Sequence, residues 1–262
     1  MKITLLQIDI AWGNPEENRK HIEELLEAAP KSDVYVLPEM FSTGFATNPD
    51  GIAESLEKSG NTYEWMLEMA VKYDAAIAGS VATETRGYDG EGKAYYNRFY
   101  FARPDGGLAW YDKKHLFTYG GEDKRYTAGN ERIIVKFRGV KFLLQICYDM
   151  RFPKFSRNNI TEDGTPAYDV ALYVASWPTP RVNAWLALAH ARAIENQCYV
   201  ATVNRVGEDP ACKYCGGTMM VDPYGVSQGM CPMNVESTIT SEIDMDKLNA
   251  FRKKFPVLND AD

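Results

Sequence analysis

The sequence is poor in paired cysteines, in histidine and in positive charge. Its five cysteines are an odd number, which does not suggest a disulfide framework and leaves room for one working thiolate in a reducing compartment. None of the three histidines stands in an arrangement that suggests a Cys–His dyad. Because 36 acidic residues outweigh 29 basic ones, the chain lacks the basic footprint of a nucleic-acid-binding protein.

Long apolar runs are also missing. None approaches the roughly 20 residues that span a bilayer, and Gln7 and Asp9 interrupt the N-terminal apolar segment where a signal peptide needs a continuous core. We therefore expect a cytoplasmic chain with neither a membrane nor nucleic acid as a partner. A content of 45% hydrophobic and 25% charged residues is ordinary for a globular protein.

Short β-rich runs alternate with helical stretches along the whole chain. Asn14 caps a helix that starts at Pro15 and stops before Pro30. Further helices are expected at 62–73, 182–196 and 244–251. Strands are expected at 2–10, 34–37, 76–81, 95–102, 107–111, 132–137, 141–146, 170–175, 199–203, 219–221 and 238–243. Hairpins mixed with crossovers predict an α/β sandwich with mixed sheets, and the absence of repeats or polar linkers predicts one domain over residues 1–262.

Cys147 is a candidate nucleophile because of where it stands. It follows the apolar run 141–146 and precedes a polar turn, and α/β proteins build their sites at the carboxyl ends of buried strands. Free cysteine is also among the most buried residue types, so position alone leaves a packing role open. A nucleophile further needs a base and a group that stabilises the oxyanion.

Two other strand ends could supply these groups. Glu39 follows the strand 34–37 beside apolar residues, and burial there would raise its pKa toward that of a general base. Lys113 follows the strand 107–111, and an ammonium beside a thiolate lowers the thiol pKa and holds an oxyanion. A lone glutamate or lysine in such a turn is usually solvated, so the interpretation depends on all three residues together. His115 is interpreted as a structural hydrogen-bonding residue.

Cys212 and Cys215 form a CxxC pair that could indicate another chemistry. A structural zinc site needs four ligands, but only Cys231 lies nearby and no histidine follows His190. A redox CxxC would open a helix, which the glycines at 216–217 oppose. We interpret both cysteines as loop and strand residues.

The segments around the three candidate residues, taken in order, resemble the nitrilase (carbon–nitrogen hydrolase) superfamily, which uses a Glu-Lys-Cys triad. The matching segments are Leu37-Pro38-Glu39 with Phe41, Tyr111-x-Lys113-x-His115-Leu116-Phe117, and Ile146-Cys147-Tyr148-Asp149-x-Arg151-Phe152-Pro153. The resemblance implies an αββα sandwich of two stacked mixed sheets flanked by helices, a cofactor-independent hydrolase and a homodimer. Segments 175–181, 191–197 and 203–207 are most similar to the bacterial omega-amidases of this superfamily.

The resemblance also implies a mechanism. Glu39 would take the proton of Cys147, whose sulfur attacks an amide carbon. Lys113 and the backbone N–H of Tyr148 would hold the oxyanion. Glu39 would then protonate the departing ammonia and activate water against the thioester. Glu122 matches the second glutamate of the family and would orient Lys113 or the amide nitrogen.

The implied substrate is the omega-amide of a small dicarboxylic acid, such as 2-oxoglutaramate or 2-oxosuccinamate. Its distal carboxylate needs a cation, for which Arg181 is the candidate, with an exposed turn arginine as the alternative. Arg151 is expected to brace the turn after Cys147 through an ion pair. Phe41, Phe117 and Trp177 would line the pocket, unless they are core residues.

Several alternatives stay open from the sequence. Within the superfamily these are a deaminated-glutathione amidase, an N-carbamoyl amidohydrolase and a true nitrilase. Outside enzymes, the chain could be a catalytically silent scaffold, although Glu39, Lys113 and Cys147 are all present. A scaffold would lack a hyper-reactive, low-pKa thiol at position 147.

Overall fold

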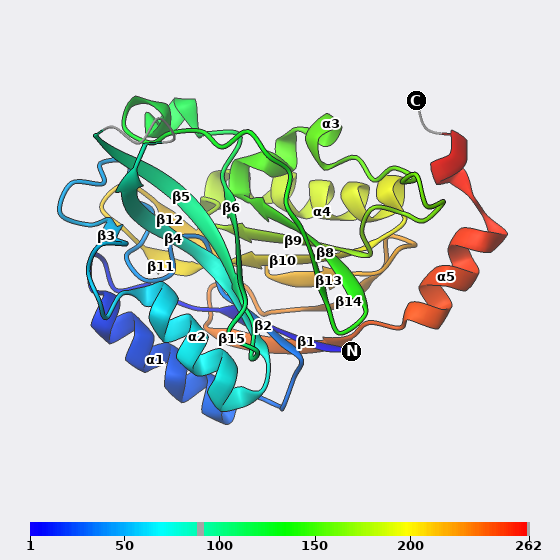
Figure 1. Cartoon of the computed structure of the whole chain (residues 1–262), viewed down its shortest axis with the longest axis horizontal. Coiled ribbons are helices and arrows are strands. Elements are labelled where there is room, and N and C mark those ends of the chain that lie inside the picture. The colour runs from blue at the N-terminus through cyan, green and yellow to red at the C-terminus, as the bar shows by residue number, and fades with distance from the viewer. Residues whose placement is uncertain (88–91, 261–262) are drawn as a thin grey trace.

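Two β-sheets face one another across the centre of the molecule (Figure 1). The computed structural model describes residues 1–87 and 92–260. In the first sheet the order is β15 (Ser237–Glu242), β1 (Lys2–Gln7), β2 (Val34–Val36), β4 (Ala76–Arg86), β5 (Lys93–Ala102) and β6 (Leu108–Asp112), with β3 (Glu54–Ser55) paired to β4. In the second sheet it is β14 (Ser227–Met230), β13 (Met219–Val221), β10 (Tyr199–Asn204), β9 (Val170–Ala175), β8 (Val140–Ile146) and β7 (Ile134–Phe137). A separate hairpin joins β11 (Val206–Glu208) and β12 (Lys213–Cys215).

Both sheets are mixed, as the sequence predicts. The centre of each is parallel, with β1, β2 and β4 in one sheet and β8, β9 and β10 in the other. The flanking pairs are antiparallel, including the predicted hairpins β5–β6 and β7–β8. The parallel centres matter for function, because their carboxyl ends meet at one end of the sandwich.

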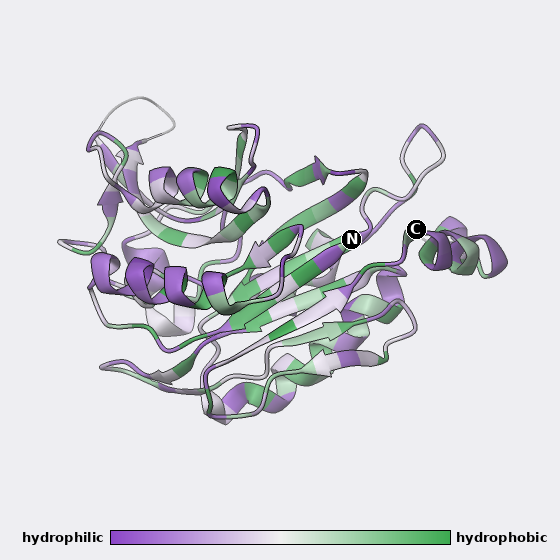
Figure 2. Cartoon of the chain, turned by 90° about the horizontal axis from the view of Figure 1, so that it is seen from below, coloured by the Kyte–Doolittle hydropathy of each residue, from purple (hydrophilic) through white to green (hydrophobic). Residues whose placement is uncertain are grey.

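Alternate side chains of the central strands enter two different cores. In β8, Leu144 packs between the sheets, whereas its neighbour Leu143 packs on the helical side of its sheet. Val36 and Tyr35 of β2 divide in the same way. This two-residue period, with both faces apolar, is what a strand covered on both sides requires. Figure 2 shows hydrophobic residues concentrated on these strands, between the helical layers.

Helices cover the outer faces of the sandwich. The helices α1 (Pro15–Ala28) and α2 (Thr62–Tyr73) lie side by side on the first sheet, and α4 (Val182–Asn196) lies on the second (Figure 1). A short helix, α3 (Pro153–Ser156), follows the Cys147 turn, and α5 (Met245–Lys254) lies at the opposite end of the molecule from β11 and β12. The expected αββα sandwich is thereby confirmed.

Most predicted elements are present with small shifts at their ends. The helices expected at 62–73 and 182–196 have those bounds, and Asn14 caps α1 by accepting from the N–H of Glu17. The short strands β3, β11 and β14 were not predicted, and β12 was predicted without bounds, only as a strand residue in the CxxC pair. Within the described residues, no helix has both the length and the apolar character needed to cross a bilayer.

Candidate active site

The three candidate residues meet at the carboxyl ends of strands from both sheets. Glu39 follows β2 and Lys113 follows β6 in the first sheet, whereas Cys147 follows β8 in the second. Ser176, directly after β9, donates its backbone N–H to Oε2 of Glu39 over 2.8 Å and so joins the two sheets at this point. The fold therefore brings together residues that lie up to 137 positions apart in the sequence.

A buried lysine lies between two buried carboxylates. Lys113 Nζ is 2.8 Å from Oε1 of Glu39 and 2.9 Å from Oε2 of Glu122, and all three side chains are inaccessible to solvent. Burial by itself lowers the pKa of Lys113, but the charges of Glu122 and Glu39 outweigh it and hold the pKa above its ordinary value. Burial, together with the charge of Glu39, raises the pKa of Glu122 although Lys113 opposes the shift. The lysine is thus a fixed positive charge.

The nucleophile turn is strained. Cys147 has φ of 46°, in the left-handed region that residues other than glycine rarely adopt. Met40, immediately after Glu39, has φ of 45°. Such strained positions persist only where the surroundings enforce them, and they concentrate at functional sites. Cys147 also begins a 3-10 helix, Cys147–Arg151, so the N–H of Tyr148 is among the first amides, which have no partner inside the helix.

The pKa of Cys147 departs from the expectation that a neighbouring ammonium lowers it. Burial and the negative charge of Glu39 raise the thiol pKa well above its ordinary value, and the opposing charge of Lys113 does not compensate. Glu39 is thus the carboxylate that acts most strongly on the thiol. The resting group is therefore a protonated thiol beside a base, and the expected low-pKa thiol is wrong for the free protein.

Asn97 and Ser80 belong to this cluster and were not found from the sequence. Asn97 Nδ2 donates to Glu39 Oε1 over 2.7 Å and to Glu122 Oε1 over 3.0 Å. The Ser80 hydroxyl donates to Asn97 Oδ1 over 2.9 Å. Both residues are buried polar groups within strands. In the sequence, the one signal for them is a polar residue inside a run that is predicted to be a strand.

Asp149 fixes the turn that carries the thiol. Its carboxylate accepts hydrogen bonds from the Tyr111 hydroxyl, the Ile146 N–H, and the N–H and ring Nδ1 of His115, all between 2.7 and 3.0 Å. His115 is thus a structural hydrogen-bonding residue, as predicted. The expected ion pair of Arg151 is wrong: with Asp149 occupied by these partners, the Arg151 guanidinium lies over the ring of Trp177, 4.8 Å from its centroid.

A pocket opens in front of Cys147. Trp177, Phe117 and Arg181 line it, as predicted, and so do residues that the sequence analysis did not place in the pocket. These are Phe45, Arg151, Ser176, Pro178, Cys212 and Tyr214. Within the described part of the chain, neither Arg151 nor Arg181 forms an ion pair with a carboxylate; the Arg181 guanidinium lies 5.3 Å from the Phe117 centroid. Two cationic groups therefore face the pocket.

Phe41 does not lie in this pocket, and its predicted place there is wrong. Its ring is fully buried on the helical side of the first sheet, 6.1 Å from that of Trp65. The left-handed turn at Met40 separates it from the thiol side. Phe45, four residues later, takes the expected position, with its ring centroid 5.2 Å from Lys113 Nζ.

The CxxC pair is divided between a loop and a strand, as predicted. Cys212 precedes β12 and lines the pocket, whereas Cys215 ends β12 and is buried. Among the residues that the structure describes, no group of three or more His, Cys, Asp or Glu side chains is arranged to hold a metal ion.

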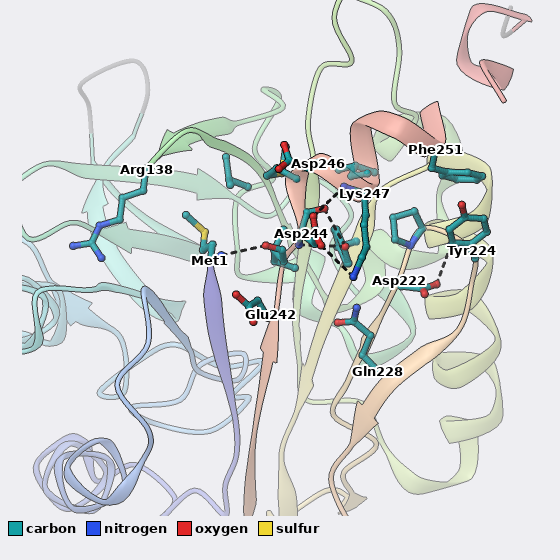
Figure 3. Close-up of a pocket in the computed structure, with 16 residues that line it drawn as sticks. Met1, Arg138, Asp222, Tyr224, Gln228, Glu242, Asp244, Asp246, Lys247 and Phe251 are labelled. Carbon is teal, nitrogen blue, oxygen red and sulfur yellow. Dashed lines mark hydrogen bonds and ion pairs between the residues drawn. The ribbon is translucent and has the colours of Figure 1, made fainter. Parts of the chain in front are cut away.

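A second hollow lies apart from this site, between Met1, the end of β15 and α5 (Figure 3). It encloses about 640 Å³. Its polar groups are partly satisfied within it, since Lys247 pairs with Asp244 at 3.2 Å and the terminal ammonium of Met1 donates to the carbonyl of Ile243. It contains none of the thiol, carboxylate and lysine residues of the strand-end cluster, so we assign the chemistry to the pocket at Cys147.

Comparison with known proteins agrees with this geometry. The family model "Carbon-nitrogen hydrolase" matches residues 2–253. "Omega-amidase YafV" of Yersinia enterocolitica is 43% identical over all of this chain and 97% of its own length, and a "2-oxoglutaramate amidase" of Bacillus subtilis is 36% identical over 98% and 96%. A CN-hydrolase superfamily protein of Xanthomonas campestris, with an arsenic adduct in its active site, superposes with a TM-score of 0.93 at 39% identity, covering 100% of this chain and 97% of that one. The chain belongs to the carbon–nitrogen hydrolase family.

Proposed function

We propose that the protein hydrolyses the omega-amide of a small 2-oxo dicarboxylic acid monoamide, such as 2-oxoglutaramate, and releases ammonia. The observation that carries this proposal is the buried Glu39–Lys113–Glu122 cluster beside Cys147, at a pocket that two arginines face. The relatives named as an omega-amidase and a 2-oxoglutaramate amidase support the same substrate class.

Acylation begins with a proton transfer within the cluster. Oε1 of Glu39 already accepts from Lys113 and Asn97, while Oε2 accepts from the N–H of Ser176 and retains a lone pair for the thiol proton. As the proton moves to Glu39, the sulfur bonds to the amide carbon and the carbonyl electrons move onto oxygen. The Lys113 ammonium and the Tyr148 N–H stabilise that oxyanion. Its collapse breaks the C–N bond, and Glu39 returns the proton to the departing ammonia.

Deacylation reuses the same groups. Glu39 takes a proton from water while the water oxygen attacks the thioester, and the second oxyanion occupies the same site. Its collapse breaks the C–S bond, frees the carboxylic acid and returns the proton to Cys147. Glu122 holds Lys113 in place, and its two oxygens accept from Lys113, Asn97 and the N–H of Phe117.

The substrate class follows from charge. The free end of a 2-oxo dicarboxylic acid monoamide is a carboxylate, which guanidinium groups bind through charge-assisted hydrogen bonds. Arg181 lies at the pocket over Phe117, and Arg151 lies at the pocket over Trp177. We assign the distal carboxylate to Arg181, as the sequence suggested, with Arg151 as a second cation that lines the pocket.

Ammonia release from a panel of compounds tests the proposal. The panel contains 2-oxoglutaramate, 2-oxosuccinamate, deaminated glutathione, an N-carbamoyl amino acid and a nitrile. We expect the highest kcat/KM for the first two, and no release by the Cys147→Ala variant at an unchanged melting temperature. Preference for the last two compounds would refute the substrate class and leave the triad standing. A fully active Cys147→Ala variant would refute the mechanism.

We also propose that residues 1–262 act as one domain, as a homodimer, in the cytoplasm. Exposed apolar side chains near α4 and α5 support an interface between two copies, since large apolar patches mark association sites. These are Ile194, Tyr224, Val226 and Phe255, each more than half exposed. Light scattering should give twice the mass of 29.5 kDa, heating should give one cooperative transition, and cell fractionation should place the protein in the soluble fraction.

A further inference from the structure

Asn97 of β5 is the one side chain among the described residues that donates to both carboxylates of the site without carrying a charge. It is fully buried, and its two amide N–H groups reach Glu39 over 2.7 Å and Glu122 over 3.0 Å. A neutral double donor between two buried carboxylates stabilises both in the ionised form. Lys113 bridges the same two oxygens as a cation.

The orientation of this amide is fixed by a chain of hydrogen bonds. The N–H of Met40 donates to the Ser80 hydroxyl oxygen over 2.9 Å. The Ser80 hydroxyl in turn donates a hydrogen bond to Asn97 Oδ1, 2.9 Å away. Asn97 is therefore held with its oxygen toward Ser80 and its NH₂ toward Glu39 and Glu122. Because Met40 directly follows Glu39, the chain begins and ends at the base.

We propose that Asn97 is a positioning residue for the base: locked by Ser80, it occupies Oε1 of Glu39 together with Lys113, so that Oε2 faces the Cys147 thiol. The inference deepens the proposed function, because it concerns the same base and rests on it. It assigns a working role to a strand residue that touches neither the thiol nor, by its position behind the carboxylates, the pocket.

The charges around Glu39 show why a neutral donor is needed there. Groups from every neighbouring segment face it: Lys113 after β6, Glu122 in the 3-10 turn Glu122–Lys124, Cys147 after β8, and the phenol of Tyr126. With Glu39 and Glu122 ionised and one lysine between them, the cluster carries one net negative charge. Without the two N–H groups, a proton on Glu39 becomes more favourable, and a protonated Glu39 cannot accept the proton of Cys147.

The test compares pH profiles of three variants with the wild type. Asn97→Ala removes both donors, and Ser80→Ala frees the amide to turn, while neither adds a charge. Asn158→Ala is the matched control, because Asn158 is equally buried and donates two N–H bonds of 3.0 Å to carbonyls far from the site. The readouts are the acid limb of kcat/KM and the pH dependence of Cys147 alkylation by iodoacetamide, which needs no substrate.

We expect the acid limb of Asn97→Ala to move upward by roughly one pH unit, with a smaller shift in the same direction for Ser80→Ala. The alkylation profile should move to higher pH as well, since two dipoles that favour anions are lost. Asn158→Ala should lower the melting temperature and leave both profiles unchanged. If both pH profiles of Asn97→Ala and Ser80→Ala equal those of the wild type, the inference is overturned, whatever the melting temperatures of the variants. If Asn97→Ala does not fold, the profiles of Ser80→Ala alone decide. If the wild type hydrolyses no amide but the alkylation profiles of Asn97→Ala and Ser80→Ala still shift, the proposed function is refuted and this inference is kept.

Discussion

Removing the buried lysine should make the stability of the protein strongly dependent on pH. Lys113→Met keeps the side-chain length and removes the charge that pairs with Glu39 at 2.8 Å and Glu122 at 2.9 Å. Breaking a buried ion pair on one side costs about 3–5 kcal/mol, because it leaves an uncompensated charge. At on the order of 2–4 °C per kcal/mol for a chain of this size, the melting temperature should fall by roughly 6–20 °C at pH 7.5.

The sign of the pH dependence follows from the carboxylates. Lys113 opposes the raised pKa of Glu122, so its removal raises the pKa of Glu122 further above the unfolded value of about 4.3. The folded variant then binds more protons than the unfolded one, and its stability falls as pH rises through the raised pKa. The defect of Lys113→Met should therefore be small near pH 4.5 and full at pH 7.5.

Thermal melts between pH 4.5 and 8 check this reasoning against a matched pair. Lys93→Met breaks an ion pair with Glu84 of similar length, 3.0 Å, but the Lys93 side chain is 71% exposed, so its melting temperature should stay close to that of the wild type. Adding Glu122→Gln to Lys113→Met should recover part of the loss at pH 7.5. A Lys113→Met defect that is equal at all pH values, or as small as that of Lys93→Met, would contradict a buried charge cluster.

Two further results are expected from the same site. Burial and Glu39 raise the pKa of the Cys147 thiol. Alkylation of Cys147 in the free protein by iodoacetamide, followed by peptide mass analysis, should therefore be slower at pH 7 than that of a free cysteine, and its rate should still increase above pH 9. A rate that reaches a plateau near neutral pH would disprove the protonated resting state. Arg181→Met should raise the KM for 2-oxoglutaramate by about 10-fold to 100-fold through loss of a charge-assisted contact, with kcat changed less. The KM for an uncharged amide of similar size should not change. An equal rise in KM for both amides would exclude a carboxylate contact at Arg181.

Glu39, Lys113 and Cys147 could be marked as candidates because each stands where an apolar strand run stops, and the resemblance to the carbon–nitrogen hydrolases identified them as a set. The partners of these residues could not. Asn97 and Ser176 are 58 and 137 positions from Glu39, and a polar residue in or after a strand gives no indication of which distant group it meets. The contact of Ser176 crosses the sandwich and exists only after the two sheets have packed, whereas that of Asn97 depends on the order of the strands within its own sheet.

Side-chain direction was equally out of reach. Phe41 and Phe45 lie in one loop with the same hydropathy, yet Phe41 packs against Trp65 and Phe45 faces Lys113. The loop contains left-handed backbone at Met40 and Gly44, and a hydropathy pattern does not show where such a loop turns each ring. The edge strand β14 escaped prediction for a different reason: its residues Ser227–Met230 are largely exposed and lack an apolar alternation.

The site draws its base and lysine from one sheet and its nucleophile from the other, with Ser176 joined to Glu39 across the boundary. The catalytic rate therefore depends on how accurately the two sheets pack against each other, since a misplacement of about 1 Å between reacting groups can lower the rate roughly 100-fold. Two fragments divided between β6 and β7 would each carry half of the machinery, and neither would be active alone. Their recovery of activity on mixing would report assembly of the sandwich itself.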